Sequence, residues 1–175
     1  MSQNVTTLTL ILVVLCFVGC GGMSGGESGL VGVWRVEELQ FISPSDTSTN
    51  PNPLPSQAIF TASHYSLVWM PGTTGMRAFQ QRWVPTDSEK IQRYGEIVVN
   101  SGVYTVDNDS LITLHPVVSR VPEFMDGGRL LYGYHTVGDT LWLTSLDEYS
   151  FDGVQAPWAE AGNRVALKLV RLEHL

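Results

Sequence analysis

Five aromatic side chains are the residues of this sequence best suited to form a binding site. They lie in three expected strands, and each ring carries one polar atom: Tyr65, Trp69, Tyr104, Tyr132 and Tyr134. Because side chains alternate along a strand, Tyr65 and Trp69 share one face, and Tyr132 and Tyr134 share another. If they face inward, these residues line a cup with apolar walls and a few hydroxyl groups, as small-ligand sites require. The alternative is a filled core, in which the same rings only pack against one another.

Other side chains with catalytic or metal-binding chemistry do not form recognisable arrangements. His64, His115 and His135 fall in separate segments, and no two of them have the local spacing of a metal-binding pair. The run Asp-Asn-Asp at residues 107–109 lacks the glycine and the terminal glutamate of a calcium loop, so a turn accounts for it. The sequence contains neither a Gly-x-Ser-x-Gly elbow nor a glycine loop suited to phosphate. We therefore expect no catalytic residue, no metal and no cofactor.

A tryptophan near the start of the expected domain and an arginine near its end form a second pair. Gly32-x-Trp34 opens the first expected strand, and Arg171 lies in the last one, on the same face as Leu167 and Leu169. An arginine in register with a buried apolar face needs a partner, and the face of a tryptophan ring is a suitable one. The pair could be a binding site, but a structural role is the simpler interpretation.

In this pattern the chain resembles the lipocalin-like (calycin) barrels, and in particular the bacterial lipocalin-like domains. In those barrels the first strand carries Gly-x-Trp, and an arginine of the last strand packs across the tryptophan to close the barrel floor. The resemblance covers most of residues 30–172 and includes three further segments: SHYS at 63–66, GVYTVD at 102–107 and VGDTL at 137–141. It implies an antiparallel up-and-down barrel whose floor is made by Gly32, Trp34 and Arg171.

The hydrophobic pattern by itself also predicts an all-β fold. About eight strands are expected, at residues 30–42, 58–61, 65–70, 103–106, 111–115, 129–137, 140–146 and 165–172. Long loops are expected at residues 43–55 and 147–162. Glu38 has the parity of Trp34, so it is either an inward polar anchor or, more simply, a solvated carboxylate at the barrel rim. Hairpin-linked strands in this number close into a barrel, which removes exposed sheet edges.

One short helix is expected among the strands, at residues 86–99. Thr86 and Glu89 have the spacing of a capping box, in which each side chain bonds the backbone of the other. Apolar residues then recur at Ile91, Tyr94 and Val98, which places them on one stripe of a helix. The sequence Asn-Ser-Gly at residues 100–102 is expected to end the helix.

The amino-terminal segment carries export signals. Residues 1–18 have no charged side chain, and their apolar run at 10–18 is too short to span a membrane but suits a signal peptide. The sequence Phe-Val-Gly-Cys at residues 17–20 resembles a bacterial lipobox, in which the cysteine becomes the lipid-modified first residue of the mature protein. Secretion without lipid is the alternative. We expect three regions: a signal peptide at 1–19, a flexible lipid-anchored spacer at 20–29 and a barrel domain at 30–175.

Charge and cysteine content restrict the partners of the mature chain. The formal net charge is −7, and no cluster of lysine and arginine is present, which argues against nucleic acid and against adhesion to anionic lipid. With Cys16 removed and Cys20 carrying lipid, no thiol remains for a disulfide or a metal site. Membrane attachment is expected through the lipid alone. Because Gly21 rather than aspartate follows Cys20, the outer membrane of the cell envelope is the favoured location.

The sequence supports three functions to different degrees. Non-catalytic binding of a small hydrophobic or amphipathic molecule in the barrel is the main hypothesis. The second is a structural or interaction lipoprotein whose barrel is filled and whose long loops contact a protein. A cavity enzyme of isomerase or cyclase type is the third, and no residue in the sequence specifically supports it.

Overall fold

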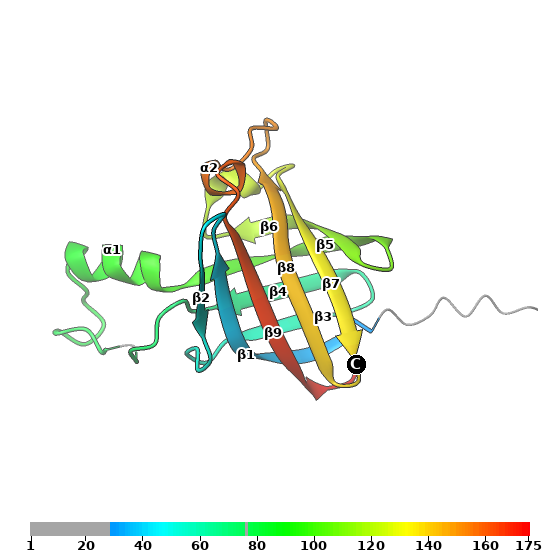
Figure 1. The fold of residues 1–175 in the computed structure, drawn as a ribbon. Helices are drawn as coiled ribbons and strands as arrows, with labels where there is room; N and C mark the ends of the chain where they lie inside the picture. The colour runs from blue at the N-terminus through cyan, green and yellow to red at the C-terminus, as the bar shows by residue number, and fades with distance from the viewer. Residues whose placement is uncertain (1–28, 76) are drawn as a thin grey trace, which may run out of the picture.

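The computed structural model describes residues 29–75 and 77–175, and the strands of this part form one continuous antiparallel sheet (Figure 1). Nine strands are present in it: β1 (Gly32–Ile42), β2 (Thr47–Asn50), β3 (Gln57–Phe60), β4 (His64–Trp69), β5 (Val98–Asn108), β6 (Leu111–Ser119), β7 (Arg129–Val137), β8 (Thr140–Tyr149) and β9 (Arg164–Glu173). The first and last strands pair along most of their length, with Trp34 opposite Arg171 and Phe41 opposite Val165. This pairing closes eight strands into a barrel, and β2 is an additional strand outside the closed set. The predicted all-β barrel is therefore confirmed.

Alternating side chains build the core, as the sequence pattern requires. In β4, Tyr65, Leu67 and Trp69 are buried, while the residues between them are more exposed. In β8, Leu141 and Leu143 are buried on the inward face of the barrel in the same way. Side chains from several strands thus meet in one apolar cluster inside the barrel.

The first strand departs from simple alternation because it contains a bulge. The register between β1 and β9 shifts between Val36 and Glu38, which inserts one extra residue into β1. Beyond the bulge Leu39 is fully buried, and the Glu38 side chain accepts a hydrogen bond from Gln40 Nε2 at 2.8 Å. Glu38 therefore does not share the inward face of Trp34, although strict alternation would place it there.

Three predicted boundaries were wrong for identifiable reasons. Residues 43–55 contain β2, because the second half of β1 offers a free edge that Thr47–Asn50 pairs with. The helix α1 (Asp87–Glu96) ends before Val98, and residues 98–102 belong to β5, paired with β4 and β6. The predicted loop 147–162 begins with the last residues of β8 and contains a short helix, α2 (Pro157–Glu160). A 3-10 turn, η1 (Pro122–Phe124), follows β6.

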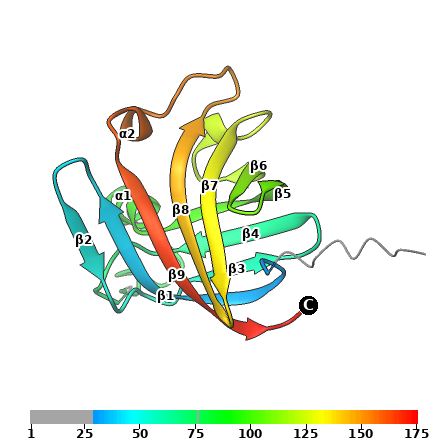
Figure 2. The ribbon, with the colours of Figure 1, turned by 45° about the vertical axis from the view of Figure 1, so that its right-hand side comes forward.

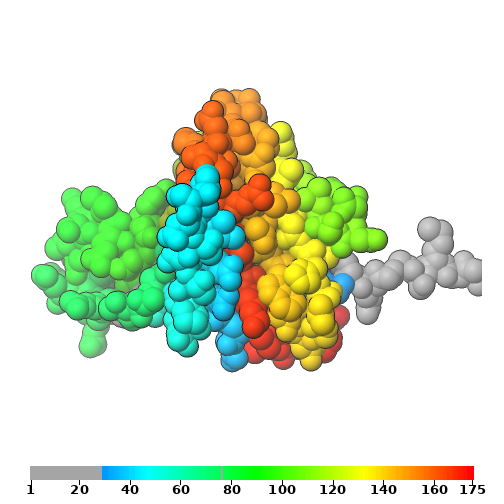
Figure 3. All heavy atoms as spheres, viewed as in Figure 1, coloured from blue at the N-terminus to red at the C-terminus, as the bar shows by residue number. Residues whose placement is uncertain are grey.

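Residues 71–75 and 77–97, which we call the arm, project from the barrel between β4 and β5. Figures 1 and 3 show the arm as the green segment that extends to the left of the barrel. The capping box at its helix is confirmed: Thr86 Oγ1 accepts from Glu89 N at 3.3 Å, and Glu89 Oε2 accepts from Thr86 N at 2.8 Å. The predicted stripe does not form one packed face: Ile91 is 74% exposed, Tyr94 contacts Arg120, and Val98 belongs to β5 and packs on the core.

Candidate ligand-binding cavity

One end of the barrel is closed by the side chains of Trp34 and Arg171. The Arg171 guanidinium carbon lies 4.0 Å from the centroid of the Trp34 ring. Arg171 also donates hydrogen bonds to the backbone carbonyls of Gly29 and Val31, and Trp34 Nε1 donates to Leu30 O at 2.8 Å. A Cβ at Gly32 would lie 2.5 Å from Arg171 Nη1, so only glycine fits beneath the guanidinium. These contacts tie both ends of the domain together in one plug.

The half of the barrel next to this plug is filled by aromatic side chains. Phe60 packs edge-on against Tyr104, with ring centroids 5.5 Å apart, and stacks against Tyr65, with centroids 6.3 Å apart. The Tyr104 hydroxyl donates to Thr61 O at 2.7 Å, and the Tyr134 hydroxyl donates to Asn108 O at 3.4 Å. Burial raises the pKa of Tyr65 well above its ordinary value, so its hydroxyl stays neutral. Tyr65, Tyr104 and Tyr134 therefore lie away from the cavity described next.

The other end of the barrel holds a cavity of about 440 Å³. Its walls come from the ends of β1, β4, β5, β6, β7, β8 and β9 and from η1 and α2. Of the five predicted aromatic residues, Trp69 and Tyr132 line it. Other apolar lining residues include Phe41, Phe124, Leu130, Trp158 and Val165. Phe124 and Trp158 meet edge to face, with ring centroids 6.2 Å apart.

The barrel is open at this end because neighbouring strands separate there (Figure 2). β7 pairs only with the first four residues of β6, from Leu111 to Leu114, and β6 then continues to Ser119 without pairing to β7. On the other side, the second half of β1 pairs with β2 instead of continuing along β3. The strand pairing alone thus accounts for a closed floor and a wide mouth.

On one wall of the cavity, three lining side chains have buried polar atoms with no hydrogen-bond partner within the described part of the chain. These atoms are Trp69 Nε1, Asn100 Oδ1 and Arg120 Nε. The Trp69 and Asn100 side chains are 8% and 6% exposed. The Arg120 side chain is held through Nη1, which donates to Tyr94 O and to Ile97 O at 2.8 Å each. The sequence analysis did not identify Asn100 or Arg120, because neither belongs to a motif and their proximity depends on strand register.

Glu148 is the acidic group of the cavity, on the β8 side. Its Oε2 accepts a hydrogen bond from Trp158 Nε1 at 2.7 Å. Burial raises the pKa of Glu148 above its ordinary value near 4.5; the hydrogen bond from Trp158 lowers it, and the nearby Asp147 charge raises it again. Burial likewise keeps the pKa of Tyr132 well above its ordinary value, so the Tyr132 hydroxyl remains protonated. Burial therefore disfavours the charged forms of both Tyr132 and Glu148.

Replacing Glu148 with glutamine should stabilise the protein increasingly as the pH rises. Because the pKa of Glu148 is raised in the folded state, its protonated form contributes to the free energy of unfolding. This contribution is fully present below about pH 4.5 and is lost as the pH rises through the folded pKa. Glutamine keeps an acceptor for Trp158 and does not ionise. Urea unfolding at several pH values between about 4 and 7 should show a widening gap between the variant and the wild type. Glu160→Gln, at an exposed position of α2, is the matched control; a pH-independent gap for Glu148→Gln would contradict the prediction.

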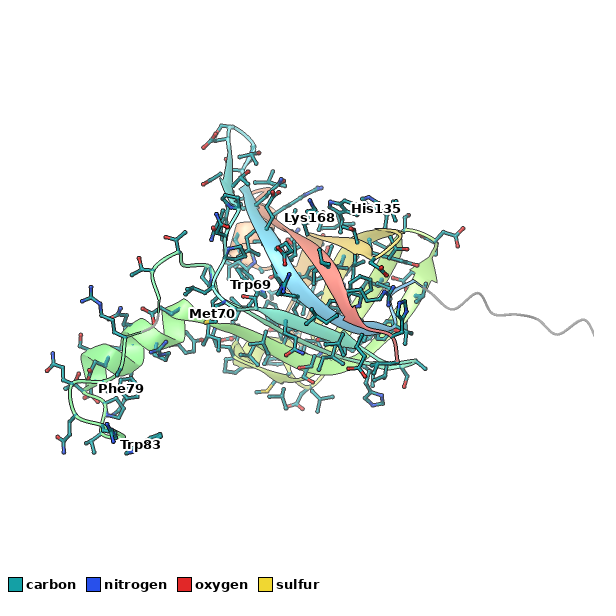
Figure 4. All side chains as sticks on the ribbon, turned by 90° about the horizontal axis from the view of Figure 1, so that it is seen from below. Trp69, Met70, Phe79, Trp83, His135 and Lys168 are labelled. Atoms are coloured by element: carbon teal, nitrogen blue, oxygen red, sulfur yellow. The ribbon has the colours of Figure 1, made fainter. Side chains whose placement is uncertain are left out.

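The histidines lie apart from this cavity. The His64 ring contacts Ser63 Oγ at 2.9 Å, and the His135 ring stacks on Trp142 at 4.4 Å between centroids. Figure 4 shows His135 on the outside of the barrel, on the same side as Lys168. Within residues 29–75 and 77–175, no group of three His, Cys, Asp or Glu side chains is placed to hold a metal ion.

In the arm, exposed apolar side chains lie far from the cavity. Figure 4 shows Trp69 and Met70 where the arm leaves the barrel, and Phe79 and Trp83 toward its far end. Trp83 is 87% exposed and adopts a positive φ of 67°. No helix in the described residues is long and apolar enough to cross a membrane.

Comparison with known proteins finds little sequence similarity. No protein-family model and no curated protein sequence matches the chain. Among solved structures, the chain is similar to a redesigned β-barrel with a TM-score of 0.37 and 15% sequence identity, over 83% of this chain and 94% of that one.

Proposed function

We propose that this chain binds a small apolar or amphipathic molecule in the cavity at the open end of the barrel, without transforming it. The observation that carries the proposal is the shape of the barrel interior, which is plugged and filled at one end and hollow at the other. A volume of about 440 Å³ lies within the range of ~300–1,000 Å³ that small-ligand sites occupy. Aromatic walls with a few polar atoms are also the usual composition of such sites.

The proposal includes a location at the bacterial cell envelope, with the chain held by a lipid on Cys20, preferentially at the outer membrane. Its support is the lipobox resemblance of residues 17–20 and the apolar run before them. These residues lie outside the part that the structure describes. The resemblance to lipocalin-like barrels supports binding rather than catalysis, as does the lack of a nucleophile paired with a base among the cavity residues named above.

Filling the cavity should abolish binding of an apolar probe. Val165 of β9 lines the cavity, so Val165→Trp adds a large ring to its interior. With the purified protein and a dye that fluoresces in apolar surroundings, such as 1-anilinonaphthalene-8-sulfonate or N-phenyl-1-naphthylamine, we expect at least about a tenfold weaker affinity, because an overpacked site excludes the probe. Val117→Trp, at a position that is 67% exposed, is the control and should bind like the wild type.

Thermal unfolding followed by circular dichroism shows whether both variants are folded. A folded Val165→Trp protein that binds the dye with unchanged affinity would contradict the proposed site. An equal loss of affinity in Val117→Trp would contradict it as well, because that side chain does not line the cavity.

A further inference from the structure

The three side chains with an unpartnered polar atom lie on β4, on β5 and directly after β6, and they line one wall of the cavity. Trp69 ends β4 and pairs with Val98, the first residue of β5. Asn100 follows two residues later on β5 and pairs with Ser119, the last residue of β6. Arg120 comes next in the chain, and its backbone N–H donates to Val99 O at 2.9 Å. Strand register therefore brings Trp69, Asn100 and Arg120 to the same side of the cavity.

These atoms have defined hydrogen-bonding roles. An indole Nε1–H and a guanidinium Nε–H can only donate, and an amide oxygen can only accept. Buried polar groups in proteins are nearly always hydrogen-bonded, because leaving one unpaired in a medium of low dielectric constant is costly. A ligand that satisfies all three must offer an acceptor for two donors and a donor for one acceptor. A carbonyl beside an N–H has this combination, since its oxygen has two lone pairs.

We propose that the ligand of this cavity carries an uncharged amide-type head group, with its carbonyl oxygen bound by Trp69 Nε1 and Arg120 Nε and its N–H bound by Asn100 Oδ1. This inference rests on the proposed function and specifies the class of molecule bound. The apolar part of the ligand packs against the remaining lining, which includes Phe41, Phe124 and Val165.

A carboxylate head group fits the same wall less well. It has no hydrogen to donate, so Asn100 Oδ1 would stay unpaired and would face a negative charge. The opposite side of the cavity adds Glu148, a second group that disfavours an anion. Arg120 keeps its positive charge, but its Nη1 already donates to two backbone carbonyls, so only part of its guanidinium is left for a two-point contact with a carboxylate. The pattern of two donors and one acceptor therefore favours an amide over a carboxylate.

A ligand series of constant chain length tests the head group on the unaltered protein. Octanamide, N,N-dimethyloctanamide and octanoate share the same acyl chain, while only octanamide offers both a carbonyl oxygen and an N–H. Measured by displacement of the fluorescent dye, octanamide should bind about five- to tenfold more tightly than either of the others, as expected for one or two added neutral hydrogen bonds. Naphthalene, which has no hydrogen-bonding group, reports on the apolar cavity alone.

Two variants test the assigned atoms. Trp69→Phe removes the donor but keeps an aromatic ring, and Asn100→Leu removes the acceptor but keeps the approximate size of the side chain. Each should weaken octanamide binding about five- to tenfold more than it weakens naphthalene binding. Trp142→Phe is the matched control, because Trp142 stacks on His135 and does not line the cavity, and it should change neither affinity.

The outcomes separate the two proposals. Equal binding of octanamide and its dimethyl derivative by the unaltered protein would overturn the amide assignment, and so would a preference for octanoate. The latter would mean that Asn100 presents its Nδ2 to the ligand, an orientation that is assigned from hydrogen bonding. If neither naphthalene nor any other member of the series binds, the proposed function itself is wrong. Because the ligand series requires no variant, the test holds even if Trp69→Phe fails to fold.

Discussion

Replacing Arg171 with methionine should lower the free energy of unfolding by about 3 kcal/mol. The substitution keeps an unbranched apolar side chain but removes the contact with the Trp34 ring and leaves two backbone carbonyls, at Gly29 and Val31, without their donor. Hydrogen bonds to charged groups contribute about 1.5–3 kcal/mol each, and a cation over an aromatic ring adds to that when it is buried. For a domain of this size the melting temperature should fall by roughly 10 °C.

The matched control for this prediction is Arg129→Met. The Arg129 guanidinium also lies over an aromatic ring, at 4.2 Å from the centroid of Tyr149, but at an exposed position of β7. Solvent screens such a contact, so its loss should cost less than about 1 kcal/mol. Similar stability losses in the two variants would show that Arg171 does not hold the barrel floor. Arg171→Lys should not restore stability, because a single ammonium cannot reproduce the planar guanidinium contacts.

Replacing Gly102 with alanine should destabilise the barrel by about 3 kcal/mol, at the upper end of the cost of overpacking a core. A Cβ at this position would lie 2.1 Å from His115 O and 2.8 Å from Val117 N, both of which are backbone atoms of β6. Moving the backbone of a paired strand costs free energy, because the strand is held by its neighbours. In the variant, β5 and β6 would have to separate locally. The effect falls next to the register shift between Ser101 and Gly102.

Gly133→Ala provides the comparison, since Gly133 also lies inside a strand. A Cβ there would be 3.6 Å from the nearest atom, in the flexible Leu146 side chain, which is ordinary van der Waals contact. Alanine should then be neutral or stabilise by up to about 1 kcal/mol, because it restricts the unfolded chain. Urea unfolding of both variants measures the difference. A Gly102→Ala protein as stable as Gly133→Ala would show that the two strands are not as close as the structure has them.

The sequence was sufficient to predict the barrel because its signals are local. Alternation of apolar residues marked most strands, the turn at Gly138-Asp139 joined β7 and β8, and Thr86 with Glu89 marked the start of the helix. Strand pairings that depend on residues elsewhere in the chain could not be predicted from such local signals. Strand β2 forms because β1 leaves an edge beside it, and its sequence, Thr-Ser-Thr-Asn, has no apolar face of its own.

The binding site was only partly predictable, for a related physical reason. Alternation along a strand indicates which face a side chain occupies. It does not indicate the position of that side chain along the barrel axis. The position along the barrel axis depends on the register between strands and on bulges such as the one after Val36. Hence Tyr65 and Trp69 share a face, but Tyr65 packs in the filled half and Trp69 lines the cavity. Asn100 and Arg120 could have been identified only if the register between β5 and β6 were known.

The position of the arm determines which parts of this chain can gain or lose residues over evolutionary time. It leaves and returns through Trp69 and Val98, which are direct partners in the sheet, so in topological terms the arm is the connection of a single hairpin. The entropy of closing a flexible connection changes by only about 0.6 kcal/mol when its length doubles. Insertions and deletions near the exposed Trp83 should therefore leave the barrel intact in related chains. The end of the arm is under a different constraint, because Arg120 binds the carbonyls of Tyr94 and Ile97. Length should vary freely before α1 and be nearly constant after it.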